Sequence, residues 1–286
     1  MNPYRLPDAT LETLLADDAP CGDATTHALG IGDRPGRMIF RARGAMTLCG
    51  SEEALRMGEL RGLHALGPLR ASGESLAAGD TILTLEGDAA ALHQVWKTAQ
   101  TLMEYLSGIA TCTAGIVAAA RRANPEIGIA CTRKNFPGTK AAAIKAVLSG
   151  GASPHRLSLS ETLLIFAEHR AFLGDEPPAA TVRRLHRQWP ERAIVVEVSD
   201  EAEALRWQAA GADILQLEKL PLDAVDRIRR SFPANAPTRI AAAGGINSAN
   251  AEMYALSGAD ILVTSAPYFA PPRDVAVTLT ASGISP

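Results

Sequence analysis

The second half of the sequence predicts a parallel α/β barrel, preceded by a smaller region of mixed α/β structure. From Ile127 onward, short apolar runs alternate with helical patterns, which is typical of a parallel sheet covered by helices. The number of such units favours closure of the sheet into a barrel. An internal repeat supports this prediction, because Ala-Gly211-Ala-Asp-Ile-Leu recurs as Ser-Gly258-Ala-Asp-Ile-Leu, each leading from a helix into a strand.

The barrel region is predicted to contain six strands separated mostly by helices. The strands are expected at Ile127–Cys131, Leu163–Phe166, Ala193–Val198, Asp213–Leu217, Arg239–Ala243 and Asp260–Val263. The helices are expected at Thr139–Ser149, Thr181–Trp189, Asp200–Ala210, Leu222–Ser231 and Ser248–Ser257.

The region before the barrel has a different pattern. Residues 8–17 predict a short amphipathic helix that follows Asp8. Recurring Gly and Pro between residues 36 and 87 predict a small sheet, with a helix at Ser51–Leu60. The stretch Ala89–Arg122 is nearly free of Pro and predicts long helices broken near Gly108. A domain boundary is therefore expected near residues 105–115.

Composition and charge restrict the class of protein. The net charge of −3 gives no basic footprint, so nucleic acid is not the expected partner. The four cysteines lie far apart without a Cys-x-x-Cys pair, which fits a reducing cytosol better than a zinc cluster or disulfide framework. The sequence has neither a signal-peptide pattern nor a run of about eighteen apolar residues. We expect a soluble cytoplasmic protein without a membrane span.

Polar residues gather where the predicted barrel strands end. The loops at the carboxyl ends of parallel barrel strands converge over the barrel mouth, which is where such proteins carry out their chemistry. Those positions hold Thr132, Arg133 and Lys134, then Glu168, His169 and Arg170, then Glu197, Glu218, Gly244, Gly245, Thr264 and Ser265. Unless this placement is a coincidence, the sequence predicts a site for a polyanionic substrate.

Two groups at these strand ends suit phosphate and metal. Gly244-Gly245 and Thr264-Ser265 follow the last two strands, where barrels commonly bind phosphate, although a glycine pair can also simply turn the chain. Glu197 and Glu218 are suited to flank a Mg²⁺ that also touches substrate oxygens, or they are solvated strand ends.

A third group suits an anionic substrate. Arg133 and Arg156 can each bind a carboxylate or phosphate with two N–H groups, and Lys134 adds a point charge. His155 is either a substrate ligand or a packed loop histidine.

Several motifs occur in an order that resembles the quinolinate phosphoribosyltransferase family. They are Gly22-Asp-Ala-Thr-Thr, Leu106-Ser-Gly-Ile-Ala-Thr, Thr132-Arg-Lys-x-x-Pro-Gly, Gly150-Gly-x-x-x-His-Arg, Glu197, Glu218 and Gly244-Gly245. The resemblance covers nearly the whole chain. It implies an N-terminal α/β sandwich over residues 1–110 and an irregular α/β barrel over residues 111–269. The tail, residues 270–286, is expected to pack back on the sandwich.

The resemblance also implies an activity, a metal and an assembly. The ribose 5-phosphate of 5-phosphoribosyl 1-diphosphate (PRPP) would be transferred, with Mg²⁺, to an anionic nitrogen heterocycle. Lys134, Glu197 and Glu218 are then the expected catalytic residues, and Gly244, Gly245, Thr264 and Ser265 the expected phosphate ligands. The expected acceptor ligands are Lys97, Arg133, His155, Arg156, Phe166, Glu168 and His169. A homodimer, or a higher oligomer of dimers, is implied, in which Lys97 serves the partner's site.

The departures from that family concern the acceptor. A family arginine is replaced by Lys97, a substrate-contacting lysine by Phe166, and the aspartate at the metal site by Glu218. The run Phe-Ala-Glu-His-Arg170 resembles the ModD branch, which is associated with molybdenum-transport operons. With one positive charge lost and an aromatic wall gained, the pocket is predicted to prefer an acceptor with fewer negative charges than quinolinate.

Two alternatives stay open at this point. In the first, Phe166 points into the core and a lysine elsewhere, such as Lys219, replaces the missing charge. In the second, the protein is not an enzyme but a non-catalytic ligand-binding or regulatory protein linked to molybdenum transport.

Overall fold

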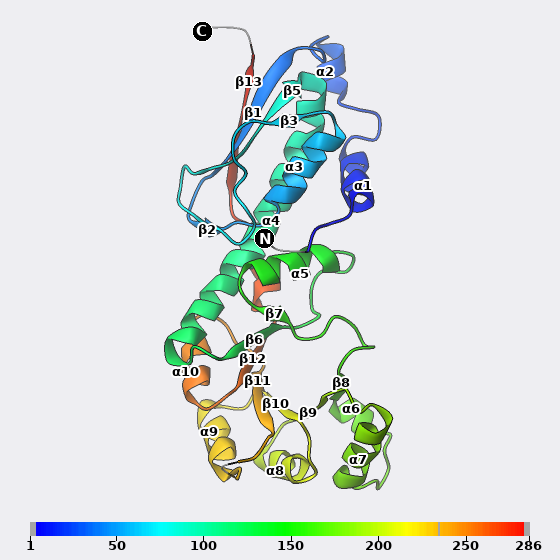
Figure 1. Ribbon diagram of the computed structural model, residues 1–286, viewed down its shortest axis with the longest axis vertical. Helices are drawn as coiled ribbons and strands as arrows, with labels where there is room; N and C mark the ends of the chain where they lie inside the picture. The colour runs from blue at the N-terminus through cyan, green and yellow to red at the C-terminus, as the bar shows by residue number, and fades with distance from the viewer. Residues whose placement is uncertain (1–3, 234, 283–286) are drawn as a thin grey trace. The chain divides into compact units, whose positions relative to one another are not determined.

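The computed structural model describes residues 4–233 and 235–282, and the chain divides into two compact units (Figure 1). The first unit comprises the described residues of Met1–Ala114, Phe136–Gly151 and Pro267–Pro286. The second comprises those of Gly115–Asn135 and Ala152–Ala266. Each unit therefore collects segments that are separated in the sequence.

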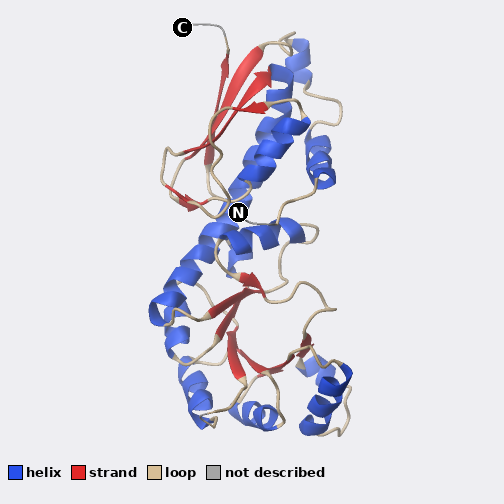
Figure 2. Ribbon diagram, in the orientation of Figure 1, coloured by secondary structure: helices blue, strands red, loops and turns tan. Residues whose placement is uncertain are grey.

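The first unit is built on an antiparallel sheet with the strand order β13-β1-β5-β3. These strands are β1 (Pro35–Ala42), β3 (His64–Ala65), β5 (Thr81–Asp88) and β13 (Val275–Ala281). Its other elements are α1 (Asp8–Asp18), α2 (Ala24–Ala28), α3 (Ser51–Leu60), α5 (Lys140–Ser149), η1 (Ala266–Phe269) and the small pair β2 (Met46–Thr47) and β4 (Ser75–Leu76). Within this unit, strands form one layer and helices lie beside it (Figure 2).

Alternation along β1 explains the core of the first unit. Met38, Phe40 and Ala42 are buried on one face of the strand, whereas the residues between them are more exposed. Apolar residues of α1 and α3, including Leu15 and Met57, join the same buried cluster. The sheet and the helices thus share one apolar core.

Helix α4 (Ala89–Ala123) is continuous, so the predicted break near Gly108 is wrong. Gly108 has another function in the helix. A Cβ atom added there would lie 2.4 Å from the Pro271 carbonyl oxygen, so a side chain would clash with the backbone of the C-terminal segment. The glycine permits close packing, which the sequence alone does not distinguish from a helix break.

Helix α4 is also the one described helix that is long and apolar enough to cross a membrane, judged by length and composition alone. Half of its most apolar window is buried inside the protein. Burial of this kind is the pattern of a core helix.

The second unit is built on a seven-stranded parallel sheet, and the sheet curls (Figure 1). Its order is β7-β6-β12-β11-β10-β9-β8. The strands are β6 (Gly128–Cys131), β7 (Ser153–Pro154), β8 (Leu163–Ile165), β9 (Ile194–Val198), β10 (Ile214–Glu218), β11 (Arg239–Ala243) and β12 (Ile261–Thr264). The accompanying helices are α6 (Ala167–Arg170), α7 (Pro178–Gln188), α8 (Glu201–Ala209), α9 (Leu222–Ser231) and α10 (Ala251–Leu256).

The predicted fold class, a sandwich followed by an irregular α/β barrel, is confirmed. Within the described part of the chain, the edge strands β7 and β8 do not pair, so the barrel is a half-barrel open at one side. The six predicted strands match β6, β8, β9, β10, β11 and β12 within a residue or so at each end. The short strand β7, the helix α6 and the strand β13 were not predicted.

The internal repeat has a structural explanation. Asp213 and Asp260, at equivalent positions in the two copies, each accept a hydrogen bond from a backbone amide at the start of a neighbouring strand, the first residue of β9 and the second of β11. The donors are Ile194 N and Ile240 N, both at 2.7 Å. The repeated aspartates therefore fix strand register at the amino ends of the sheet, away from the carboxyl-end residues.

Candidate active site

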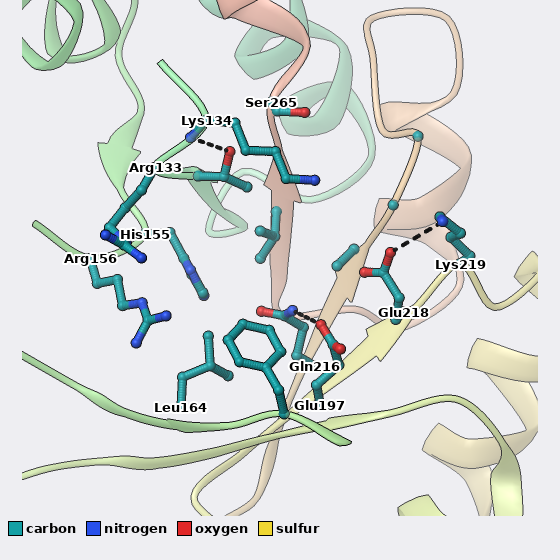
Figure 3. Close-up of a pocket in the computed structure, with 16 residues that line it drawn as sticks. Arg133, Lys134, His155, Arg156, Leu164, Glu197, Gln216, Glu218, Lys219 and Ser265 are labelled. Carbon is teal, nitrogen blue, oxygen red and sulfur yellow. Dashed lines mark hydrogen bonds and ion pairs between the residues drawn. The ribbon is translucent and has the colours of Figure 1, made fainter. Parts of the chain in front are cut away.

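A pocket of about 400 Å³ lies at the carboxyl ends of the strands of the second unit (Figure 3). Its lining is Thr132, Arg133, Lys134, His155, Arg156, Leu164, Phe166, Glu197, Gln216, Glu218, Lys219, Ala243, Gly244, Gly245, Val263 and Ser265. Ten of the predicted site residues belong to this lining: Arg133, Lys134, His155, Arg156, Phe166, Glu197, Glu218, Gly244, Gly245 and Ser265.

Strand register brings the polar residues of the central strands together. Glu197 on β9 pairs with Gln216 on β10, and the Gln216 Nε2 donates to Glu197 Oε2 at 2.8 Å. Glu218 lies two residues after Gln216, so both side chains leave the same face of β10. One face of the curled sheet thus carries two carboxylates with an amide between them.

The same face of the sheet is apolar two residues closer to the amino ends of these strands. Val195, Ile214 and Ala241 form a buried cluster with Leu164, Ala243 and Val263, and Phe166 packs against it. The cluster fills the inside of the half-barrel, as side chains do in parallel barrels. The pocket therefore lies above a packed core, and part of its floor is apolar.

Three cations in the lining have no carboxylate partner among the described residues. They are Arg133, Lys134 and Arg156, whereas Lys219 Nζ lies 3.8 Å from Glu218 Oε1. Arg156 is only 8% exposed, and its guanidinium lies 5.7 Å from the centroid of the Phe166 ring. Burial and the nearby charge of Arg133 lower the pKa of Arg156. A buried, uncompensated guanidinium is costly, and an anionic ligand would offset that cost.

His155 is half-buried beside these arginines, and its backbone N–H donates to Cys131 O at 2.7 Å. Burial and the Arg156 charge lower the pKa of its imidazole below the usual value. The ring is therefore neutral at pH 7, with one N–H donor and one nitrogen acceptor for a ligand.

The two glutamates fit a divalent cation held jointly with substrate. Burial, followed by the charge of Glu218, raises the pKa of Glu197, and a cation between the two carboxylates would relieve this repulsion. Among the described residues, no three His, Cys, Asp or Glu side chains form a metal-binding group. Two carboxylates suit Mg²⁺, because Mg²⁺ usually takes one or two carboxylates and completes its shell with water and phosphate.

Glu197→Gln is expected to be more stable than the wild type at pH 7. The folded-state pKa of Glu197 is raised. The contribution of this carboxyl to folding stability is therefore fully present below about pH 4.5, and it is lost as the pH rises through the folded-state pKa. The variant's advantage should therefore shrink toward pH 4. Denaturant unfolding in metal-free buffer at both pH values measures this, and an advantage that grows on acidification would contradict it.

Gly244 shapes the end of the pocket near Glu218. Its φ is +90°, and an added Cβ would lie 2.5 Å from Lys219 Cγ and 3.0 Å from Lys219 N. Lys219 itself has a φ of 55°, an uncommon conformation for a residue with a side chain. These two loops therefore approach closely, and Gly244 leaves backbone groups accessible for an anion.

Thr264, Glu168 and His169 do not line the pocket. Thr264 is buried, and its hydroxyl donates to Ile246 O at 2.6 Å and accepts from Ala266 N, so it holds the loop after β11 against β12. Glu168 is exposed. His169 is exposed too, but its Nδ1 accepts from Phe166 N at 3.0 Å and its ring stacks on Phe166. His169 thus positions the aromatic wall.

Lys97 belongs to the first unit and is absent from this lining. Its Nζ lies 4.4 Å from the centroid of the Trp96 ring and donates to Gln100 Oε1 at 3.2 Å. With Asp17, Asp18 and Tyr105 it lines a separate hollow of the first unit.

Sequence reasoning missed Gln216 as a site residue. The signal was present, because a glutamine inside the apolar run Ile-Leu-Gln-Leu-Glu218 interrupts a buried strand. Thr132 and Leu164 also line the pocket and carried no comparable signal.

Family models match both halves of this chain. Residues 23–107 match "Quinolinate phosphoribosyl transferase, N-terminal domain" and residues 109–278 match the corresponding C-terminal domain. The chain belongs to the quinolinate phosphoribosyltransferase family.

Similarity to individual proteins supports this family assignment. A Rhodobacter capsulatus protein named "Putative pyrophosphorylase ModD" is 46% identical over 248 residues, covering 87% of this chain and 95% of that protein. "Probable nicotinate-nucleotide pyrophosphorylase (carboxylating)" of Methanothermobacter thermautotrophicus is 35% identical over 66% of this chain and 69% of its own. The crystal structure of NadC from Streptococcus pyogenes superposes with a TM-score of 0.87 at 25% identity, covering 96% of each chain. The resemblance to the ModD branch is confirmed.

Proposed function

We propose that this protein transfers the ribose 5-phosphate of PRPP to an anionic nitrogen heterocycle and releases diphosphate. The supporting observation is the pocket at the carboxyl ends of a parallel sheet, in which three cations face two glutamates and have no carboxylate partner in the described part of the chain. Membership of the quinolinate phosphoribosyltransferase family favours this reaction over other uses of a cationic pocket. We also propose that the protein works in the cytoplasm, consistent with four free cysteines.

In the proposed reaction, a lone pair on the heterocycle nitrogen forms a bond to C1 of the ribose. The bond from C1 to the diphosphate oxygen breaks, and its electron pair leaves with diphosphate. Glu197 and Glu218 stabilise the positive charge that develops on the ribose, while Lys134, Ser265 and the Gly244-Gly245 N–H groups hold the phosphates. Mg²⁺, held by Glu197 and Glu218, would act as a Lewis acid toward the phosphate oxygens.

Calorimetry with PRPP and Mg²⁺ tests this proposal most directly. Wild type is expected to bind PRPP, and Lys134→Met to bind it at least tenfold more weakly, because a charged phosphate partner is lost. Lys140→Met, an exposed lysine outside the pocket, is the matched control and should bind as wild type does. Absence of wild-type binding at millimolar PRPP would rule out the transferase.

A non-catalytic binding protein is the second candidate, favoured by Phe166 at the position where the family resemblance implies a substrate-contacting lysine. Such a protein would bind PRPP without releasing diphosphate in the presence of any acceptor. Measuring diphosphate release alongside binding separates the two candidates.

The acceptor is proposed to carry fewer negative charges than quinolinate. Phe166 is half-buried, lines the pocket and lies beneath Arg156, so it forms an aromatic wall there. Lys219 lies next to Glu218 and Gly244, on the other side of the pocket from Arg156 in Figure 3. This position supports a role for Lys219 toward phosphate and leaves the acceptor side with one cation fewer.

Phe166→Lys is expected to raise quinolinate turnover by at least a hundredfold over a slow wild type. A second carboxylate left without a cation costs about 3–5 kcal/mol, and the lysine would restore its partner. Phe166→Met, which is apolar like phenylalanine, is the control. Steady-state kinetics with quinolinate decides the matter, since a wild-type kcat/KM of about 10⁴ M⁻¹s⁻¹ or more would contradict the argument.

We propose a homodimer in which Lys97 serves the site of the partner subunit. Lys97→Met and Glu218→Gln should each be nearly inactive, whereas co-refolded mixtures should recover about a quarter of wild-type activity, because half the dimers are mixed and each has one intact site. A monomer in sedimentation, or no recovery on mixing, would refute the shared site.

A further inference from the structure

Gln216 is a buried polar residue of the pocket for which the proposed chemistry gives no role. It is 5% exposed and lies on β10 between the apolar Leu215 and Leu217. A buried glutamine is uncommon unless both ends of its amide are hydrogen-bonded. In this protein only one end is, because the Nε2 donates to Glu197 while the Oε1 has no partner among the described residues.

The orientation of the amide follows from its neighbour. An ionised carboxylate only accepts hydrogen bonds, so the NH₂ group must face Glu197 and the oxygen must face away. Figure 3 shows the oxygen turned from Glu197 toward the side of the pocket where Leu164 and His155 lie. The unpartnered oxygen of Gln216 is therefore on the side of the pocket proposed to bind the heterocyclic substrate. The residues proposed to hold phosphate lie elsewhere.

No donor from the described residues reaches that oxygen. Leu164, Phe166 and Val263 in the lining are apolar, and the neutral His155 makes no hydrogen bond to Gln216. A buried acceptor without a donor carries the full cost of its lost hydration. An arriving N–H group would recover that cost, whereas an apolar group at the same place would not.

We propose that Gln216 Oε1 accepts a hydrogen bond from the heterocyclic acceptor and thereby selects a class of substrate. This inference rests on the proposed transfer reaction and specifies its acceptor. The favoured acceptor is a heteroaromatic carboxylate that carries a second group with an N–H, either a ring N–H or an amino substituent. Its carboxylate binds Arg156, its ring lies on Phe166, and its N–H reaches Gln216, leaving another ring nitrogen with a lone pair for the bond to ribose.

The test uses paired probes that differ only in the donor. Nicotinates with an amino group at each free ring position are compared with the methyl compounds of the same substitution, by calorimetric binding to the full-length protein. For at least one position, wild type should bind the amino compound about tenfold or more tightly than its methyl twin. A site built to hydrogen-bond a substrate group rejects analogues that lack it by such factors or larger.

Gln216→Met removes the acceptor and keeps a side chain of similar size. The amino preference should fall to less than about threefold in this variant, with the methyl compound bound as well as or better than by wild type. Gln188→Met, an exposed glutamine on α7, should behave as wild type does. Thermal unfolding of Gln216→Met checks folding, and its midpoint should equal or exceed that of wild type because an unpartnered buried group is gone.

Three results would overturn the inference. The first is that wild type shows no preference for the amino compounds, or binds none of them. The second is a preference for the amino compound that survives in Gln216→Met. The third is a tenfold weakening of PRPP binding by Gln216→Met. The last result would assign the oxygen to a ribose hydroxyl. PRPP binding by wild type is measured separately, so failure of this inference and failure of the proposed transferase are distinguishable.

Discussion

Lys145→Met is expected to lower the free energy of unfolding by about 3–5 kcal/mol, the usual cost of removing one partner from a buried ion pair. Lys145 is 1% exposed, and its Nζ lies 2.9 Å from Glu52 Oε2 and 2.5 Å from Glu53 Oε2. Both glutamates belong to α3, and Lys145 belongs to α5, which joins the first unit from a distant part of the sequence.

The expected loss of stability is large because the carboxylates of Glu52 and Glu53 stay buried when the ammonium group of Lys145 is removed. Burial alone would raise the pKa of Glu52, but hydrogen bonds from Ser72 and Lys145 outweigh burial and lower it to about 2. Burial opposes the charge of Lys145 as well, yet its hydrogen bonds to Glu53 and Glu52 raise its pKa. Without the ammonium group, the carboxylates lose their nearest cation and keep the cost of burial.

Denaturant unfolding measures this loss, and two variants serve as controls. Lys140→Met, an exposed lysine on the same helix, should change stability by less than about 0.5 kcal/mol. The triple variant Lys145→Met, Glu52→Gln, Glu53→Gln should recover part of the loss, because no buried charge is left unpaired. A Lys145→Met protein as stable as the Lys140→Met control would show that the ion pairs of Lys145 with Glu52 and Glu53 contribute nothing to the free energy of unfolding.

Arg156→Met is expected to weaken acceptor binding by a few hundredfold or more without lowering stability. The guanidinium is nearly buried and has no carboxylate partner among the described residues, so its removal relieves a cost, and methionine retains much of the apolar stem. The bound acceptor, in contrast, loses the partner of its carboxylate, which is worth about 3–5 kcal/mol.

Binding of aminonicotinates and denaturant unfolding are measured on the same Arg156→Met preparation. Arg239→Met is the matched control, since Arg239 is exposed at the amino end of β11, the opposite end of the strand from the pocket. Wild-type acceptor affinity in Arg156→Met would remove Arg156 from the site. A large loss of stability would show that Arg156 is a packing residue whose charge is satisfied in the folded protein.

The sequence by itself determined most of the secondary structure of the second unit and many of the residues of the candidate site. Alternating apolar runs and helical patterns are local signals, and the polar residues that follow each strand needed only the rule that carboxyl ends converge. Glu197, Glu218 and Arg133 were predicted in this way, and the lining of the pocket contains all three.

The tertiary structure decided what depends on contacts between distant segments. Gly108 was expected to break a helix because the sequence does not show the Pro271 backbone that packs against it. Thr264 was expected to bind phosphate, and only the structure shows its hydroxyl bound to Ile246 O. The sequence shows Gln216 as a glutamine inside an apolar run, but only strand pairing places it beside Glu197, with an oxygen that has no partner among the described residues. A hydrogen bond between strands depends on register, and register is not a property of either strand alone.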